Sequence, residues 1–250
     1  MPVDCSHIFD ACGKNYTIIY DFGKFRDKTS KDPDVYSFVG TSDEAPDHEA
    51  VCISKNLNIE LFNKYTEHLK SRKIVGYGNY TPLYPMFDLN DSRHIMMSTT
   101  IFTNIKEKLS HIVEIGGGFG NWLYLNQINS FDKWTIVDLP FVIPLQKWFL
   151  KEQDVSLNYE FATPDGKVEN PDLVIGAHSL SEISIDEFEK YFKNIMCHAK
   201  YVFYAYHTFS LDMSILRLKR AMIESRFDII CDVASQGGTV SNGLYKAKYP

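Results

Sequence analysis

The sequence has few features that would place it outside the ordinary globular proteins. Its five cysteines are scattered and none belongs to a CxxC pair, so neither a disulfide framework nor a zinc site is expected and a reducing compartment is favoured. No stretch approaches the roughly 20 apolar residues that span a bilayer, and residues 1–14 lack a secretory signal pattern. We therefore expect a soluble, cytoplasmic protein with no membrane partner.

The sequence also lacks an excess of basic charge. Its 26 Lys and Arg residues stand against 32 Asp and Glu residues, which gives a net charge of −6. That balance provides no overall attraction to nucleic acid. We find no internal repeat and no low-complexity segment, and a chain of 250 residues that is 44% hydrophobic can bury a large core without covalent or metal cross-links.

Seven short runs rich in β-branched and aromatic residues predict strands, at 112–115, 134–138, 157–161, 173–177, 201–206, 227–233 and 243–248. Helical patterns separate most of them, which is typical of a Rossmann-like α/β fold with a mostly parallel, doubly wound sheet. The connection around residues 236–239 is too short for a crossover helix, so strand seven is expected to pair antiparallel with strand six.

The chain is predicted to divide near residue 91. Residues 92–250 would form the α/β domain, and residues 1–91 a less regular, α-rich extension that caps the active site or mediates homodimer formation. Helical spacing of apolar residues predicts helices at 58–72 and at 92–109, the second leading into strand one.

The strongest chemical signal follows the first predicted strand, where the chain reads His-Ile-Val-Glu-Ile-Gly-Gly-Gly-Phe-Gly-Asn from His111 to Asn121. Glycines at a strand-to-helix turn let the backbone approach a ligand closely. One βα unit later, Asp138 would end strand two, where a carboxylate commonly binds a pair of ribose hydroxyls. The motif therefore consists of an acid and a glycine loop followed by a second acid, and its residues are Glu114, Gly116, Gly117, Gly118, Gly120 and Asp138.

Two types of nucleotide cofactor could use such a motif. In the dinucleotide fingerprint the third glycine would fall at the position of Asn121, so a nicotinamide-dependent oxidoreductase with an atypical loop remains an alternative. A cofactor with a cationic sulfonium and an amino acid tail has no pyrophosphate, and it suits a nearby carboxylate such as Glu114.

These residues resemble the first motif and the ribose-binding acid of the class I S-adenosylmethionine-dependent methyltransferases, and the expected terminal hairpin is similar to that family's reversed seventh strand. Residues 113–120, 136–140 and 178–182 further resemble a group of sugar O-methyltransferases. The resemblance covers residues 92–249. It implies S-adenosylmethionine as cofactor, with Glu114 and the glycine loop at its amino acid end and Asp138 at its ribose. The remaining implied cofactor contacts are Leu139, Ala162, Thr163 and Ala177.

The implied reaction is methyl transfer to a hydroxyl of a sugar, nucleotide-sugar or glycan. A sugar hydroxyl is a poor nucleophile, so a general base is expected after strand four. His178 has a suitable side chain for that role, with Glu182 orienting it or acting as the base itself, and His207 is the second candidate base. The alternative to an enzyme is a non-catalytic subunit that binds the cofactor only.

The acceptor side is less clearly marked in the sequence. Tyr80 and Tyr84 could form an aromatic wall for a sugar or belong to the core, and Arg93 could contact an anionic acceptor or the cofactor carboxylate. Asp88 and Asp91 lie nearby, but we predict no metal site. The Asn/Asp-Pro-Pro-aromatic motif of amide and adenine N-methyltransferases is missing after strand four, which argues against a nucleic acid substrate.

Overall fold

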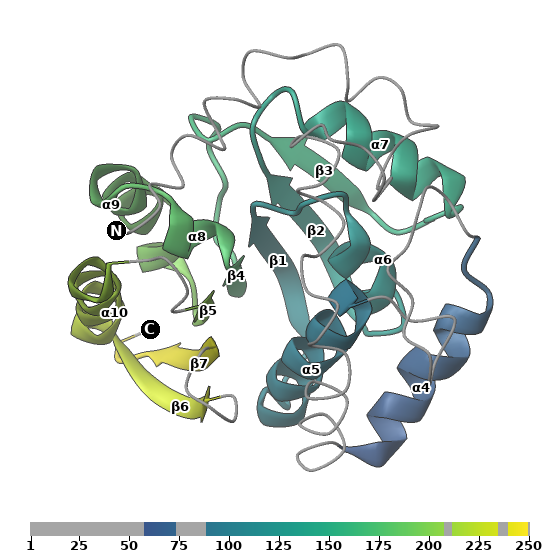
Figure 1. The fold of residues 1–250 in the computed structure, drawn as a ribbon, viewed down its shortest axis with the longest axis horizontal. Helices are drawn as coiled ribbons and strands as arrows, with labels where there is room; N and C mark the ends of the chain where they lie inside the picture. Colours follow the sequence, from purple (N-terminus) through teal and green to yellow (C-terminus); the bar gives the residue numbers. More distant parts are fainter. Residues whose placement is uncertain (1–57, 74–88, 208–211, 235–239, 250) are drawn as a thin grey trace.

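A seven-stranded sheet forms the centre of the protein in the computed structural model, which describes residues 58–73, 89–207, 212–234 and 240–249 (Figure 1). The strand order is β3-β2-β1-β4-β5-β7-β6. The strands are β1 (Leu109–Ile115), β2 (Phe131–Val137), β3 (Tyr159–Ala162), β4 (Leu173–Ala177), β5 (Tyr201–His207), β6 (Phe227–Ala234) and β7 (Val240–Ala247). Strands β1 to β5 pair in parallel, whereas β7 is antiparallel to both β5 and β6. The predicted doubly wound sheet with a reversed seventh strand is confirmed.

Helices cover both faces of the sheet (Figure 1). Four of them lie on one face: α4 (Ile59–Lys70), α5 (Leu89–Asn104), α6 (Asn121–Asn126) and α7 (Ile143–Glu152). The opposite face carries α9 (Ile185–Asn194), the 3₁₀ helix η2 (Met196–His198) and α10 (Met213–Arg226), and the short helix α8 (Ser179–Glu182) follows β4. In the sequence, Ser184 followed three residues later by Glu187 predicts the start of a helix, and the Ser184 hydroxyl does cap α9, because it accepts a hydrogen bond from the Glu187 amide at 3.2 Å.

Two local differences from the predicted elements have simple causes. The helix expected at 92–109 runs instead over Leu89–Asn104, because Leu109 already belongs to β1 and pairs with Phe131 of β2. Helix α8 was not predicted, since four residues are too few to show a helical period.

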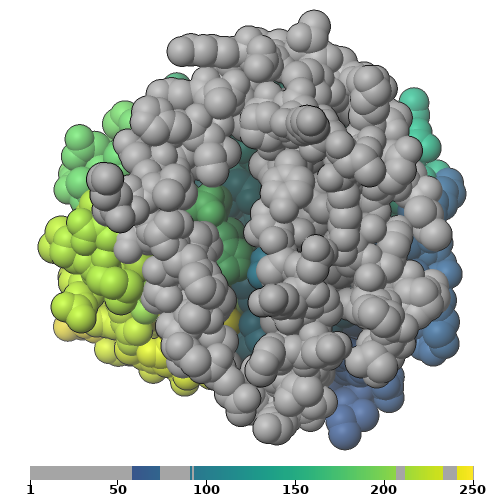
Figure 2. Space-filling view, in the orientation of Figure 1, coloured from purple at the N-terminus to yellow at the C-terminus, as the bar shows by residue number. Residues whose placement is uncertain are grey.

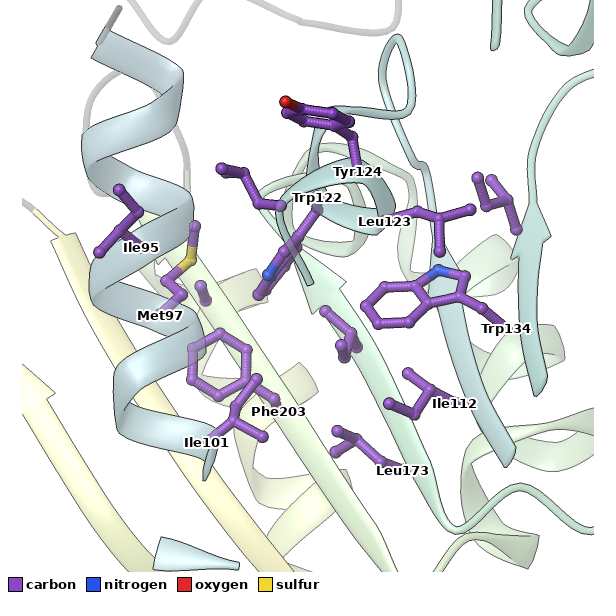
Figure 3. Close-up of a cluster of buried hydrophobic side chains, with 14 of the residues drawn as sticks. Ile95, Met97, Ile101, Ile112, Trp122, Leu123, Tyr124, Trp134, Leu173 and Phe203 are labelled. Carbon is purple, nitrogen blue, oxygen red and sulfur yellow. The ribbon is translucent and has the colours of Figure 1, made fainter. Parts of the chain in front are cut away.

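The core on the α4–α7 face is built around large aromatic side chains (Figure 3). Trp122 of α6 meets Phe203 of β5 edge to face, with ring centroids 5.9 Å apart. Met97 and Ile101 of α5 point into the same cluster (Figure 3) and are fully buried. Burial of this kind supplies most of the free energy of folding, and it fixes α5 and α6 against the sheet.

Buried polar contacts also hold α5 beside the glycine loop. The Arg72 guanidinium pairs with Asp91 at 2.6 Å, and both side chains are almost fully buried. Asp91 also accepts a hydrogen bond from Asn121 at 2.9 Å, the residue that opens α6 directly after the glycines. The N-terminal helices thus connect to the start of α6 through charge as well as packing.

Figure 2 shows the molecule from the same side in a space-filling view. The helices α9 and α10 form its left margin and α4 its right margin (Figure 2). None of the helices within the described ranges is long and apolar enough to cross a membrane.

Candidate active site

The glycine loop joins β1 to α6. It lies at the switch point of the strand order, because β2 and β3 follow on one side of β1 and β4 and β5 on the other. Open α/β sheets bind ligands outside the carboxyl ends of the strands at such a position. Gly116, Gly118 and Gly120 all have positive φ, at 75°, 56° and 94°, a region that other residues avoid. A Cβ placed on Gly118 would meet no atom of the described structure within 4 Å, so no described residue packs against this side of the loop, which we call its open side.

Asp138 lies at the same edge, immediately after β2. Its backbone amide donates to the Ala162 carbonyl at the end of β3 at 3.0 Å, and its carboxylate accepts from the Leu139 amide at 2.8 Å. Leu139, Ala162 and Thr163 are partly exposed here. The structure therefore brings the second acid and these predicted cofactor contacts to one edge, next to the glycine loop.

The two acids of the motif lie close enough to affect each other. Glu114 is only 3% exposed and accepts a hydrogen bond from the Trp134 indole at 3.0 Å. Burial raises the pKa of Glu114 to about 8, and the negative charge of Asp138 adds to this rise. Burial also raises the pKa of Asp138 to about 6. Among the residues that the structure describes, no basic side chain contributes to either pKa, so a ligand that brings positive charge would be favoured here over a pyrophosphate.

Gln146, which the sequence did not mark, joins the loop to the second acid. This residue lies on α7 and is fully buried. Its side-chain nitrogen donates to the Asp138 carboxylate at 2.6 Å and to the Gly118 carbonyl at 3.0 Å.

The segment after β4 contacts the glycine loop directly. The Ser179 hydroxyl donates to the Ile115 carbonyl at the end of β1, and a Cβ on Gly116 would lie 2.6 Å from that hydroxyl and closer still to the Ser179 Cβ. Ala177, partly exposed, ends β4 just before this segment. The predicted cofactor loop and the predicted catalytic segment are therefore in contact.

His178 has a strained backbone at the centre of this arrangement. Its φ is 63° and its ψ is −48°, which is close to a γ-turn conformation that residues with a Cβ rarely adopt. Its amide donates to the Ala205 carbonyl of β5 at 2.8 Å, and its carbonyl accepts from the Ser181 hydroxyl at 2.5 Å. Strain of this type costs about 1–3 kcal/mol and is concentrated at functional sites.

A buried lysine, which the sequence did not mark either, donates hydrogen bonds to the carbonyls of α8 and of the residue that follows it. Lys219 of α10 is fully buried, and its ammonium donates to the carbonyls of Leu180, Ser181 and Ile183 at 3.0, 3.0 and 2.5 Å. Three acceptors require all three protons of the ammonium. Burial lowers the pKa of Lys219 to about 8, and the nearby Glu182 opposes this effect, so the group is charged at neutral pH.

Replacing Lys219 with methionine should lower the free energy of unfolding by about 2–5 kcal/mol, because the carbonyls of α8 would lose their donor. Arg217→Met is the matched control, since Arg217 lies on the same helix and is exposed, and it should change stability by no more than about 0.5 kcal/mol. Urea denaturation measures both values. Equal unfolding midpoints for the two variants would contradict the bracing role of Lys219.

The other predicted residues have varied positions. Glu182 ends α8 and is partly exposed, as is Arg93 on α5. His207 is the last residue of β5, where its backbone pairs with Val240. Tyr80, Tyr84 and Asp88 lie outside the described residues. Across the part of the chain that the structure describes, no group of three or more His, Cys, Asp or Glu residues could hold a metal ion.

No protein-family model and no curated protein matches the sequence. Several solved structures match the fold. PH1948 of Pyrococcus horikoshii, proposed to be an RNA methyltransferase, is 10% identical with a TM-score of 0.54, and the match covers 74% of this chain and 95% of that one. PH0226 of the same organism is 12% identical with a TM-score of 0.53, and the match covers 64% of this chain and 91% of that one. Protein 1320 of Thermoplasma acidophilum is 10% identical with a TM-score of 0.52, and the match covers 76% of this chain and 99% of that one. Together with the reversed β7, these similarities show that the chain has the class I methyltransferase fold.

Proposed function

We propose that this protein is an S-adenosylmethionine-dependent O-methyltransferase whose acceptor is a hydroxyl of a sugar, nucleotide-sugar or glycan. The observation that carries the cofactor assignment is the pair of neighbouring acids, Glu114 and Asp138, at the end of β1 and directly after β2. The pKa values of both are raised, and no basic side chain of the described ranges offsets this. A cofactor with a cationic sulfonium and an ammonium group would stabilise the ionised form of both acids, whereas a dinucleotide would add two negative charges beside them.

The residues at the strand ends divide the binding of this cofactor between them. Asp138 would accept hydrogen bonds from the two ribose hydroxyls, as strand-two acids commonly do in related sheets. Gly118 leaves room for a ligand to approach the backbone, and Glu114 would lie toward the amino acid end. Leu139, Ala162 and Thr163 would contact the adenine.

S-adenosylmethionine, when bound, supplies an already activated methyl group, so the protein's main task is to align the acceptor with it. His178 would accept the proton of the acceptor hydroxyl as methyl transfer proceeds. Glu182 lies on the helix that begins directly after His178 and would orient the imidazole or accept the proton itself. The strained backbone of His178 supports a functional role for this position.

The sugar acceptor is supported by the sequence resemblance of the three strand-end segments. The acidic net charge is consistent with an acceptor other than nucleic acid. The first test of the acceptor is a screen of nucleotide-sugars and free sugars with a radiolabelled methyl donor.

The cofactor assignment is tested by calorimetric titration with S-adenosylhomocysteine, using NAD as the comparison. We expect the wild type to bind S-adenosylhomocysteine and not NAD. Asp138→Asn, which keeps the size of the side chain and removes its charge, should bind at least about tenfold more weakly. Binding of NAD alone would support an oxidoreductase instead, and binding of S-adenosylhomocysteine without turnover on any acceptor would support a non-catalytic subunit.

A further inference from the structure

The Gln146 amide forms an internal link within the proposed cofactor site. Both hydrogens of its side-chain nitrogen are used, one on the Asp138 carboxylate and one on the Gly118 carbonyl. Its side-chain oxygen is buried and accepts no hydrogen bond from any residue in the described ranges. An unpaired buried oxygen has a free-energy cost that an apolar side chain would avoid, so the two donated hydrogen bonds account for an amide at this position.

The amide lies beneath the loop and not on its open side. A Cβ on Gly117 would stand 3.4 Å from the Gln146 nitrogen and 2.6 Å from Ile136 of the sheet. A ligand on the open side of Gly118 would therefore be separated from Gln146 by the loop itself. Any effect of Gln146 on that ligand must pass through Gly118 and Asp138.

We propose that Gln146 is a positioning residue for cofactor binding, which fixes the distance between the glycine loop and Asp138 and holds the Asp138 carboxylate in its charged form. This inference rests on the proposed function, since it requires Asp138 to bind the cofactor ribose. A carboxylate can accept a hydrogen bond from each of two hydroxyls, whereas a protonated carboxyl group must also place its own hydrogen.

The charged and polar groups around Asp138 determine how its protonation responds to the loss of Gln146. The Leu139 and Gly117 amides and Gln146 lower the pKa of Asp138, against a larger upward effect of burial that brings it to about 6. Burial and the charge of Asp138 raise the pKa of Glu114 on β1 to about 8, while Tyr191 on α9 stays neutral because its pKa is raised well above the usual range. Removing the Gln146 donor should raise the pKa of Asp138 further.

The test compares Gln146→Met with Gln153→Met, because methionine has a similar length and no hydrogen to donate. Gln153, the residue at the C-terminal end of the same helix, is a matched control. It is buried and its side chain also makes two hydrogen bonds, both to the backbone of Lys73 at 3.0 and 2.8 Å, about 10 Å along the helix from Gln146. Both variants should lose stability, measured by thermal unfolding. Only Gln146→Met should weaken binding of S-adenosylhomocysteine, by about 10- to 100-fold at pH 7.

The pH dependence separates positioning from a general loss of structure. Wild-type affinity should rise as the pH increases through about 6, where Asp138 loses its proton. In Gln146→Met this rise should occur at higher pH, so the ratio of the two Kd values should be largest near neutral pH and smaller at pH 9.

The outcomes are distinguishable. A wild type that does not bind S-adenosylhomocysteine would overturn the proposed function itself. A folded Gln146→Met that binds as tightly as the wild type, or with the same Kd ratio at every pH, would overturn only the positioning role. If Gln146→Met does not fold, Gln146→Leu replaces it, because leucine also has no hydrogen to donate. It should show the same weakening and the same pH shift, and wild-type binding would overturn the inference.

Discussion

His178→Ala and His178→Gly should each lower kcat for methyl transfer by about 10²- to 10⁴-fold, the usual contribution of a general base. The expected size of the effect follows from the weak nucleophilicity of a sugar hydroxyl. Affinity for S-adenosylhomocysteine should change little, because His178 is assigned to the acceptor proton and not to the cofactor. Single-turnover rates and calorimetry measure the two quantities separately.

The same two variants should differ in stability in an unusual direction. At φ of 63°, alanine keeps the steric conflict of a Cβ and glycine does not. The free energy of unfolding of His178→Gly should therefore be about 1–2 kcal/mol higher than that of His178→Ala. At an ordinary helix or strand position glycine is the less stable of the two. If both variants lose the same activity and His178→Gly is the more stable of the two, the strained backbone at this position serves to orient the imidazole.

A control and a competing residue complete this experiment. His198 is exposed in η2, so His198→Ala should retain full activity. Glu182→Gln decides between the two roles left for Glu182, because a loss as large as that of His178→Ala would make it the base. Undiminished kcat in both His178 variants would remove His178 from the chemistry.

Gly116→Ala and Gly118→Ala should fail in different ways although both positions have positive φ. The backbone strain, about 1–2 kcal/mol, is common to the two. The new Cβ at Gly116 would collide with Ser179, whereas the one at Gly118 would meet no described atom within 4 Å. We therefore expect Gly116→Ala to lose about 2–5 kcal/mol of stability, with overpacking added to strain, and Gly118→Ala to fold almost normally.

Affinity for S-adenosylhomocysteine should separate the two variants in another way, because the more stable variant, Gly118→Ala, is expected to bind poorly. Gly118→Ala should weaken binding strongly in a protein that remains folded, because its methyl group would occupy the space assigned to the cofactor. Chemical denaturation and calorimetry on the same samples test this. Normal cofactor affinity in Gly118→Ala would show that the open side of the loop is not where the ligand lies.

The sequence was sufficient to predict the features that depend on local pattern. Runs of β-branched and aromatic residues, separated by helical patterns and turn residues, predicted the sheet and its reversed last strand. Asp138 was predicted to end strand two, and it directly follows β2. Short-range chemistry also predicted the Ser184 cap of α9, since both its partners lie within one helical turn.

The residues that the sequence left unmarked act over long separations. Gln146 and Lys219 occupy helical positions where glutamine and lysine are ordinary, solvent-compatible residues. Gln146 connects Asp138, 8 residues away, with Gly118, 28 residues away, and Lys219 binds carbonyls 36 to 39 residues away. No local pattern encodes these pairings. The left-handed backbone of His178 is likewise imposed by contacts with β5 and α8 and not by its own preference.

The contact between Ser179 and the end of β1, together with the support of α8 by Lys219, also bears on the order in which the site forms during synthesis. The glycine loop leaves the ribosome long before its partner at Ser179, and α8 precedes the lysine that holds its carbonyls. The glycine loop, Asp138 and the segment after β4 can therefore reach their final arrangement only after α10 has emerged. A nascent chain that stops before α10 would contain every residue assigned here to the cofactor and still lack a stable place for the acceptor.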